Sequence, residues 1–460
     1  MKKNIFFVGA GGIGMAALER YFLSKGYNVG GYDLTPSQLT QKLMEEGVVI
    51  NFVGDEDSIP ENFRNPDDTT VVYTPAVPDD LGCMRWFRQK GFEIKKRAQI
   101  LGEITRNSKS ICFAGTHGKT TSSSIAAHIL NITKGTGCNA FLGGILRNYG
   151  SNLILSVTSP YTVVEADEYD RSFHHLSPYI AVITSTDPDH LDIYHTEKEY
   201  LESFSYFTSL IEKNGYLLLN TGLKMIPRVK PSVKTYKYST SGEEADFMAF
   251  NIERKDNHLF FDLKFPDKTV AKSLELGLPV RINIDNSVAA IGAVWLTGHF
   301  DENAVREALL SFKGAERRFE LRWEEKNGRK RIIIDDYAHH PREITASINS
   351  IKEMYPGRKI TIVFQPHLYS RTKDHFEEFA KALSLSDKVI ITPIYPARER
   401  PIAGVDSNLI LDKIELTDKA LVSKEDFPEY IKNSNFDVLL TLGAGDLPNY
   451  IPALINILEN

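Results

Sequence analysis

A short glycine-rich segment at residues 111–122, ICFAGTHGKTTS, has the residue types that bind a nucleotide triphosphate. The Gly-Lys-Thr at 118–120 follows an apolar run and precedes a stretch typical of a helix. Backbone amides at the helix start, the lysine charge and the threonine hydroxyl would then face one point and favour polyphosphate with Mg²⁺. The usual phosphate loop needs a glycine where this chain has Phe113. Here the glycine is Gly115, so the predicted loop is shorter than usual.

Two clusters of charged side chains follow the next two apolar runs. In an open parallel sheet, ligands bind beyond the carboxyl ends of the strands, so both clusters are expected near the phosphate loop. Carboxylates in that place suit Mg²⁺ ions that bridge nucleotide oxygens, although single ones would more often be helix caps. His190 alone would more often be a structural histidine. The clusters are Glu165, Asp167 and Glu168, and then Asp187, Asp189, His190 and Asp192.

A second glycine-rich loop stands near the start of the chain. Gly9, Gly11 and Gly14 form G-x-G-x-x-G after an apolar run, with Gly12 between them, and Asp33 ends the next apolar run. This is the dinucleotide fingerprint, but physically it means only that backbone amides can approach a diphosphate at a helix start. A UDP-type ligand, a dinucleotide and a tight turn without a ligand all remain compatible with it.

Composition narrows the class of protein. The 60 acidic and 54 basic side chains leave no basic excess, so nucleic acid is not an expected partner. No stretch approaches the roughly 18 apolar residues of a membrane span, which favours a cytoplasmic enzyme without such a span. The three cysteines, Cys83, Cys112 and Cys138, are odd in number and lack metal-ligand spacing, so we expect buried free thiols.

The elements that must position these residues are strands and helices in alternation. Short Val/Ile-rich runs alternate with amphipathic stretches from end to end, which predicts an α/β fold with mostly parallel sheets. We predict a Rossmann-like domain at 1–107, a central P-loop-type ATPase domain at 108–313 and a second Rossmann-like α/β domain at 314–460. Within the central domain, residues 235–282 alternate as antiparallel strands do.

Several motifs together resemble a known family. The chain carries, in this order, GTHGKTT, VEADEYD, TDPDHLDIY, FKGAERRFE, DDYAHHP, FQPHLYSRT and IYPARERPIAGVDS. This series resembles the Mur ligases of peptidoglycan synthesis over essentially the whole chain. The resemblance implies an enzyme that uses ATP to join a carboxylate to an amine through an acyl phosphate. It is nearest to the branch that adds L-alanine to UDP-N-acetylmuramate. A branch that adds a ready-made tripeptide stays an alternative, and a nucleotide-binding oxidoreductase is a remote one.

The resemblance also implies roles for individual residues. It implies ATP and two Mg²⁺ ions as cofactors, with Thr120 and Glu165 on one ion and Glu165 with His190 on the other. The catalytic residues that it implies are Lys119, Glu165, His190, Arg318 and Asp336. The ATP-binding residues are Gly115, Thr116, His117, Gly118, Lys119, Thr120, Thr121, Asn283, Asn286, Arg318 and Asp336. The substrate-binding residues are Gly9, Gly11, Gly12, Gly14 and Asp33 for UDP, and Tyr337, His339, His367 and Arg371 for the muramate carboxylate and the amino acid.

Some alternatives stay open beside these roles. Asn286 could instead cap the following helix, and Arg317 could be a solvated neighbour of Arg318. The family commonly has His at the position of Ile282, and many relatives have Arg at that of Leu368. We also expect a monomer or weak homodimer, and closure of the third domain about a hinge near 313–318.

Overall fold

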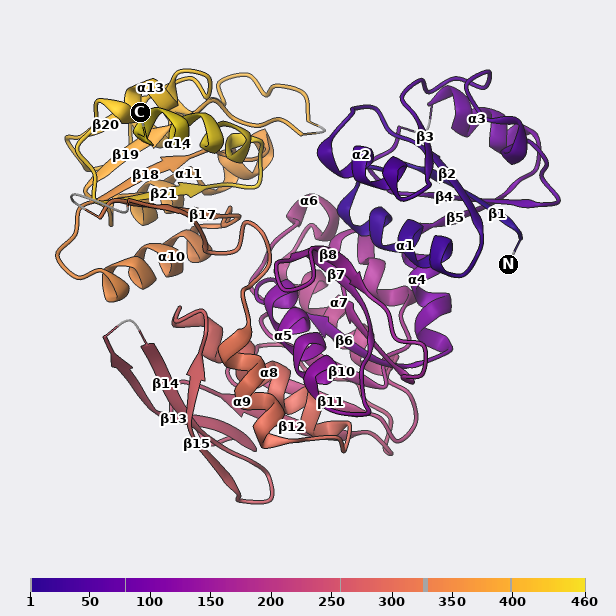
Figure 1. The fold of residues 1–460 in the computed structure, drawn as a ribbon, viewed down its shortest axis with the longest axis horizontal. Coiled ribbons are helices and arrows are strands. Elements are labelled where there is room, and N and C mark those ends of the chain that lie inside the picture. Colours follow the sequence, from indigo (N-terminus) through magenta and orange to yellow (C-terminus); the bar gives the residue numbers. More distant parts are fainter. Residues whose placement is uncertain (1, 79, 257, 326–329, 398, 460) are drawn as a thin grey trace. The chain divides into compact units, whose positions relative to one another are not determined.

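The computed structural model is an α/β structure with three sheets (Figure 1). It describes residues 2–78, 80–256, 258–325, 330–397 and 399–459, without the side chains of residues 191 and 192. The chain divides into two compact units. The first contains residues 1–279 and 283–313, and the second contains 280–282 and 314–460. The predicted α/β class with mostly parallel sheets is confirmed, whereas the predicted domain limits stay predictions.

The first sheet has five parallel strands in the order β3-β2-β1-β4-β5. β1 lies at the centre and is buried throughout, because the alternating side chains of its apolar IFFV run pack on both faces of the sheet. The order reverses between β1 and β4, which places the loop after β1 at the ligand-binding edge of such a sheet. The elements are β1 (Asn4–Val8), α1 (Ile13–Ser24), β2 (Asn28–Tyr32), α2 (Gln38–Glu45), β3 (Val49–Asn51), η1 (Glu61–Phe63), β4 (Thr69–Tyr73), α3 (Gly82–Gln89), β5 (Glu93–Lys96) and α4 (Arg97–Arg106).

The second sheet has ten strands in the order β15-β14-β13-β12-β11-β10-β6-β9-β7-β8. Its parallel centre, β10-β6-β9, carries the phosphate loop and the acidic clusters at its carboxyl end. Its strands are β6 (Lys109–Ala114), β7 (Asn139–Leu146), β8 (Ser151–Ile154), β9 (Tyr161–Glu165), β10 (Ile180–Ile183), β11 (Tyr216–Asn220), β12 (Lys234–Ser239), β13 (Phe247–Lys255), β14 (His258–Lys264) and β15 (Val270–Leu276). Its helices are α5 (Lys119–Ile132), η2 (Tyr169–His175), α6 (Leu191–Tyr194), α7 (Glu197–Ser209), α8 (Ile282–Leu296) and α9 (Glu302–Ser311).

The prediction of antiparallel strands over residues 235–282 is only partly right. β13, β14 and β15 pair antiparallel, as expected from their alternating burial. β12 instead pairs in parallel with both β11 and β13, and so extends the parallel part of the sheet.

Helix α1 joins the first sheet to the second within the first unit. Its apolar side chains share one core with Phe141 of β7 and Leu153 of β8. Asn152 of β8 donates its amide to the Ile13 carbonyl at 2.5 Å and accepts from Arg20 at 2.9 Å. The helix that begins at the N-terminal glycine loop is therefore anchored on the sheet that carries the phosphate loop.

The second unit holds a sheet in the order β16-β17-β21-β18-β19-β20. All its neighbouring strands run parallel except the edge strand β16, which pairs antiparallel with β17. Its strands are β16 (Glu320–Glu324), β17 (Ile332–Asp336), β18 (Ile360–Phe364), β19 (Lys388–Ile391), β20 (Lys419–Leu421) and β21 (Val438–Leu442). Its helices are α10 (Pro341–Met354), α11 (Tyr369–Leu383), α12 (Asn408–Leu411), α13 (Phe427–Lys432), η3 (Leu447–Tyr450) and α14 (Ile451–Glu459).

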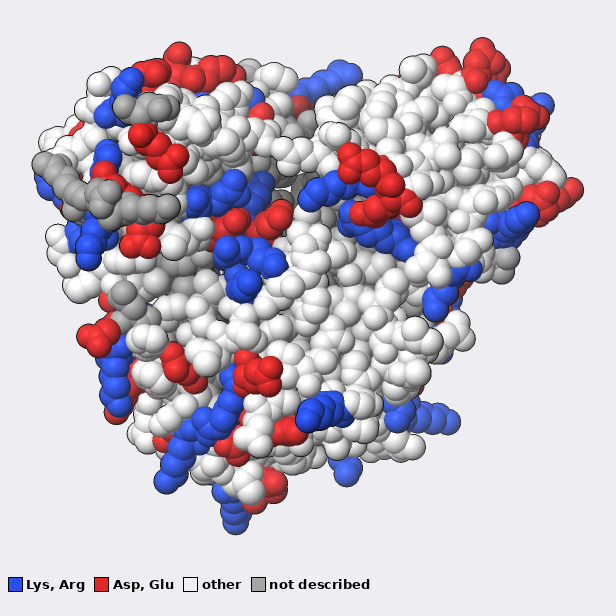
Figure 2. Space-filling model, in the orientation of Figure 1, with Lys and Arg blue, Asp and Glu red and all other residues white. Residues whose placement is uncertain are grey.

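Three features bear on the class of protein. Cys83, Cys112 and Cys138 are free and buried, which confirms the prediction for the thiols. In the described part of the chain, no helix combines the length and the apolar character needed to cross a membrane. On the face drawn in Figure 2, basic and acidic side chains lie interspersed, and the net charge is −6.

Candidate active site

The phosphate loop, residues 115–120, connects β6 to α5 and depends on two glycines. Gly115 has φ +139°, and Gly118, the N-cap of α5, has φ +83°, a left-handed conformation that favours glycine. A Cβ on Gly115 would overlap the Thr184 hydroxyl, and one on Gly118 would lie 2.6 Å from the Asn286 side-chain oxygen. The shortened loop therefore has a defined shape that leaves no room for side chains at these positions.

The end of β10 holds this loop in place. Thr184 donates its hydroxyl to the Ala114 carbonyl at 3.1 Å, and the His117 amide donates to the Ser185 hydroxyl at 2.8 Å. The Thr116 hydroxyl donates to the Asp187 carbonyl at 2.6 Å. The loop backbone is thus fixed before any ligand arrives, which lowers the ordering cost of binding.

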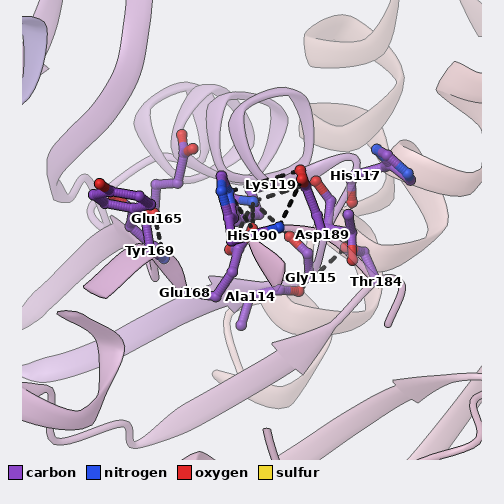
Figure 3. Close-up of polar contacts among 12 residues, drawn as sticks. Ala114, Gly115, His117, Lys119, Glu165, Glu168, Tyr169, Thr184, Asp189 and His190 are labelled. Carbon is purple, nitrogen blue, oxygen red and sulfur yellow. Dashed lines mark hydrogen bonds and ion pairs between the residues drawn. The ribbon is translucent and has the colours of Figure 1, made fainter. Parts of the chain in front are cut away.

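Lys119 lies between the loop and a buried carboxylate (Figure 3). Its ammonium donates to the Gly115 carbonyl at 2.6 Å and lies 2.8 Å from a carboxylate oxygen of Glu168, whose side chain is 2% exposed. Burial raises the pKa of Glu168 to about 7. Burial alone would lower the pKa of Lys119, but the nearby carboxylates, Glu168 first, outweigh it, so the pKa is raised and the lysine stays charged. The loop therefore presents a fixed positive charge.

Thr120 and Glu165 lie together, as the resemblance implies for a shared metal ion. The Thr120 hydroxyl donates to the Glu165 carboxylate at 2.8 Å at the end of β9. Gly143 of β7 leaves room for that carboxylate, since a Cβ there would overlap it. Hydroxyl and carboxylate oxygens are the donors that Mg²⁺ prefers, so this pair fits the ion.

His190 is placed by a different set of contacts. Its Nε2 lies 3.9 Å from Glu168 and 3.7 Å from Asp189, and Tyr169 packs edge-on against its ring. Among the residues whose side chains are described, no three or more His, Cys, Asp or Glu gather as a metal centre. The side chain of Asp192 lies outside the described residues. Metal binding by Thr120, Glu165 and His190 stays a prediction.

Asn283 and Asn286 lie in the first turns of α8, which begins at Ile282. The alternative of Asn286 as a helix cap is wrong, because this residue is inside the helix and buried. Its side-chain oxygen accepts from Ser122 of α5 at 3.2 Å, beside Gly118. The helix thus brings Asn286 to the phosphate loop, as expected for a residue near ATP.

The N-terminal glycine loop, residues 9–14, is braced by Asp33. The Gly11 amide donates to the Asp33 carboxylate at 2.7 Å. The Asp33 carboxylate is thus engaged by the backbone of the loop itself.

In the second unit, the predicted residues gather at the carboxyl ends of β17 and β18. Asp336 is buried and accepts a hydrogen bond from Ser347, and burial raises the pKa of its carboxyl group to about 6. The guanidinium of Arg318 lies 4.9 Å from the Tyr337 ring centroid.

Two of the predicted histidines, His339 and His367, lie just after the ends of β17 and β18. The His339 and His367 rings are 6.2 Å apart, and Arg371 lies 3.5 Å from His367. His340, the neighbour of His339, is the N-cap of α10. Leu368, which departs from the family pattern, is buried with φ +70°.

Arg317 is not the solvated neighbour that the sequence left possible. It donates to the carbonyls of Gly443 and Gly445 at 2.6 and 3.1 Å, and lies 3.5 Å from buried Asp335. Arg317 therefore ties the start of this unit to the loop after β21.

Sequence reasoning missed several supports of the site. Tyr200 of α7 pairs its hydroxyl with Thr116 at 2.8 Å, and the Tyr194 hydroxyl donates to the Glu168 carbonyl. Both tyrosines are fully buried. The only sequence feature that could have indicated their role is their position shortly after the second acidic cluster. Glu168 stood in the first cluster, but nothing in the sequence showed that it would hold Lys119.

The chain matches three family models in succession. Residues 4–109 match the Mur ligase family catalytic domain, residues 113–294 the Mur ligase middle domain, and residues 317–445 the Mur ligase glutamate ligase domain.

Named relatives and solved structures agree with these matches. The chain is 51% identical to the UDP-N-acetylmuramate–L-alanine ligase of Phocaeicola vulgatus, covering 99% of this chain and 98% of that one. It is 49% identical to the ligase of the same name from Porphyromonas gingivalis, covering 98% and 97%. The crystal structure of UDP-N-acetylmuramate-alanine ligase from Thermotoga maritima matches with a TM-score of 0.82 at 26% identity, covering 98% of each chain. A murein peptide ligase from Psychrobacter arcticus shares the fold, with a TM-score of 0.72 at 20% identity, covering 100% and 99%.

Proposed function

The chain belongs to the Mur ligase family, and we propose on this basis that it joins L-alanine to the carboxylate of UDP-N-acetylmuramate at the expense of ATP. The products are UDP-N-acetylmuramoyl-L-alanine, ADP and phosphate, and the reaction belongs to peptidoglycan biosynthesis. The observation that carries the proposal is 51% identity over 99% of the chain to a relative with this name.

The reaction has two steps. The muramate carboxylate attacks the γ-phosphate of ATP and displaces ADP, which gives an acyl phosphate. The amine of L-alanine then attacks the acyl carbon, and phosphate leaves with one oxygen of the original carboxylate. The carbonyl of the acyl phosphate is far more reactive than that of the free carboxylate, so ATP makes the amide bond possible.

The main physical obstacle is repulsion between the carboxylate and the phosphate. Two unit charges 4 Å apart repel by about 4 kcal/mol at an effective dielectric constant near 20. The ammonium of Lys119 lies at the phosphate loop and offsets this repulsion. Mg²⁺, held by Thr120 and Glu165 and in a second site by Glu165 and His190, would supply further positive charge.

The amine of L-alanine must lose a proton before it attacks. We assign this role to His339 or His367, because imidazole titrates near neutral pH. In His339, Nδ1 lies 3.0 Å from the Tyr337 carbonyl, which can only accept. The neutral ring therefore carries its proton on Nδ1, and Nε2 is left as the basic nitrogen.

Two rival functions are less well supported. The tripeptide-adding branch differs around the QPH segment, and the likeness to the murein peptide ligase of Psychrobacter arcticus, at 20% identity, supports the fold alone. An oxidoreductase would leave Lys119, Glu165 and the phosphate loop without a role. The proposal includes two Mg²⁺ ions, a monomer or weak homodimer, and action in the cytoplasm, where ATP is available.

The test is a direct comparison of acceptor amines. The protein is incubated with ATP, Mg²⁺, UDP-N-acetylmuramate and either L-alanine or the tripeptide, and the product is identified by its mass. We expect the L-alanine adduct together with phosphate release. Formation of the tripeptide adduct alone, or NADH oxidation without ligation, would contradict the proposal.

A further inference from the structure

We propose that Arg97, at the start of α4, binds the diphosphate of the UDP-linked substrate at the glycine loop, and that Asp167 positions it there. The inference rests on the proposed function, which places UDP at residues 9–14, and it adds a binding residue that the glycine motif does not contain. Arg97 lies in the basic segment KKRAQIL, where α4 begins, shortly before β6.

Most amides of the glycine loop are already used inside the protein. Within the described chain, the amides of residues 9–12 each have an acceptor. Gly9 and Ala10 donate to the Tyr32 carbonyl, Gly11 to Asp33 and Gly12 to the Gly9 carbonyl. Residues 13 and 14 begin α1, and amides in the first turn of a helix have no acceptor within the helix itself. The capacity of the loop to bind an anion is therefore concentrated at Ile13 and Gly14.

Arg97 lies at this point. A Cβ built on Gly14 would overlap the Arg97 guanidinium, so the guanidinium packs directly against the Gly14 backbone. Its side chain is 25% exposed, which leaves it accessible to a ligand. A planar guanidinium presents several parallel donors and binds phosphate oxygens in pairs. The third glycine of the motif thus makes room for an arginine.

The other side of Arg97 is held by the acidic segment, residues 165–170. One guanidinium nitrogen lies 3.1 Å from the Asp167 carboxylate, and the adjacent Lys96 lies 2.7 Å from Asp170. Asp167 stands between Glu165 and Glu168, which contact Thr120 and Lys119 of the phosphate loop. Arg97 therefore links the glycine loop to the segment that also contacts the ATP loop.

The test measures binding of UDP and of UDP-N-acetylmuramate to the full-length protein by calorimetry, with ADP titrated in parallel. For Arg97→Ala we expect affinity for both UDP ligands to fall about tenfold or more, as for the loss of a charge-assisted hydrogen bond. Affinity for ADP should stay within twofold. Arg97→Lys should restore part of the loss, because it keeps the charge but not the paired donors. Arg85→Ala is the matched control, since Arg85 is an exposed arginine of α3 in the same sheet domain.

Two further variants separate this role from a structural one. In Gly14→Ala the new methyl group should displace the guanidinium, so the loss of UDP affinity should match that of Arg97→Ala and not add to it in the double variant. Asp167→Asn should weaken UDP binding by a smaller factor, with no further effect in the Arg97→Ala background. Additive losses would overturn the positioning role of Asp167.

The result distinguishes this inference from the proposed function. If the native protein makes the L-alanine adduct and Arg97→Ala binds UDP as the native protein does, only the inference is wrong. An equal loss of ADP and UDP affinity in Arg97→Ala would also overturn it, because general disturbance would then explain the data. If the native protein binds no UDP ligand and makes no adduct, the proposed function itself fails.

Discussion

At the scale of single residues, the site is organised by buried charge. Lys119 is paired with Glu168 at 2.8 Å, and both side chains are largely withdrawn from water. Taking such a pair out of water is costly, and removal of one partner leaves the other without compensation. The pair therefore holds the lysine at the phosphate loop and also makes the fold depend on both members.

We predict that Lys119→Met abolishes phosphate release and lowers stability by about 3 kcal/mol, because Glu168 is left buried without its cation. The double variant Lys119→Met/Glu168→Gln should regain most of the stability but none of the activity. Calorimetric unfolding and a phosphate-release assay measure the two effects. A single variant as stable as the native protein would show that the pair does not hold the site together.

Asp336 predicts a dependence of stability on pH. Burial, the main cause, raises its pKa to about 6 from the ordinary 3.8, so the folded state holds this proton over a range where the unfolded chain has lost it. Stability should therefore fall as pH rises from about 4 to about 6, by roughly 2 to 3 kcal/mol from this group, and then level off.

Asp336→Asn removes the titrating group and so isolates its contribution. The difference in stability between the native protein and this variant should change with pH by that amount over the same range. Unfolding curves measured at several pH values test this, and a constant difference between the two proteins would contradict it.

At the scale of elements, the site is a set of strand ends joined to helix starts. The sequence was sufficient to predict β6, the phosphate loop and α5, since an apolar run, glycines and Gly-Lys-Thr follow one another directly. It could not predict that Thr184 and Tyr200 would hold the loop, because such contacts depend on which strands become neighbours. The same limit applies to Arg97, because its contact with Gly14 depends on where α4 packs and cannot be predicted from the local sequence. For the same reason, the parallel pairing of β12 could not be predicted from the local alternation of apolar and polar residues.

The glycines of the phosphate loop give a prediction at this scale. Gly118→Ala places a side chain at φ +83° and 2.6 Å from Asn286, so we expect a rise in the KM for ATP of at least tenfold. Gly242→Ala is the matched control, because it has φ +87° with no atom within 4 Å of the new Cβ. Both should lose about 1 to 2 kcal/mol of stability from backbone strain. An equal KM in the two variants would show that contact with Asn286 has no part in binding.

At the scale of the whole molecule, each unit has a core of its own, yet the chain does not divide cleanly between them. Val280 is 2% exposed and belongs to the core of the second unit, although the chain around it belongs to the first. We predict that Val280→Ala destabilises the second unit by about 2 kcal/mol. Hydrogen exchange should quicken in β17, β18 and β21 and stay unchanged in β6 and β10. Val157→Ala, at a fully exposed valine, is the control.

The roles that the family resemblance implies for Arg318 and Asp336 of the second unit, and for Lys119 of the first, predict that the two units act together. We therefore expect the radius of gyration in solution scattering to fall when UDP-N-acetylmuramate and a non-hydrolysable ATP analogue are both present, since closure excludes water from the acyl phosphate. The same scattering curve with and without ligands would argue against closure.

The central claim is that the muramate carboxylate attacks ATP, and transfer of an oxygen isotope tests it most directly. UDP-N-acetylmuramate labelled with ¹⁸O in its carboxylate is converted with ATP and L-alanine, and the released phosphate is analysed by mass spectrometry. An acyl phosphate intermediate predicts one ¹⁸O atom in each phosphate formed from fully labelled substrate, with the other retained in the new amide. Unlabelled phosphate released in step with product would contradict the account.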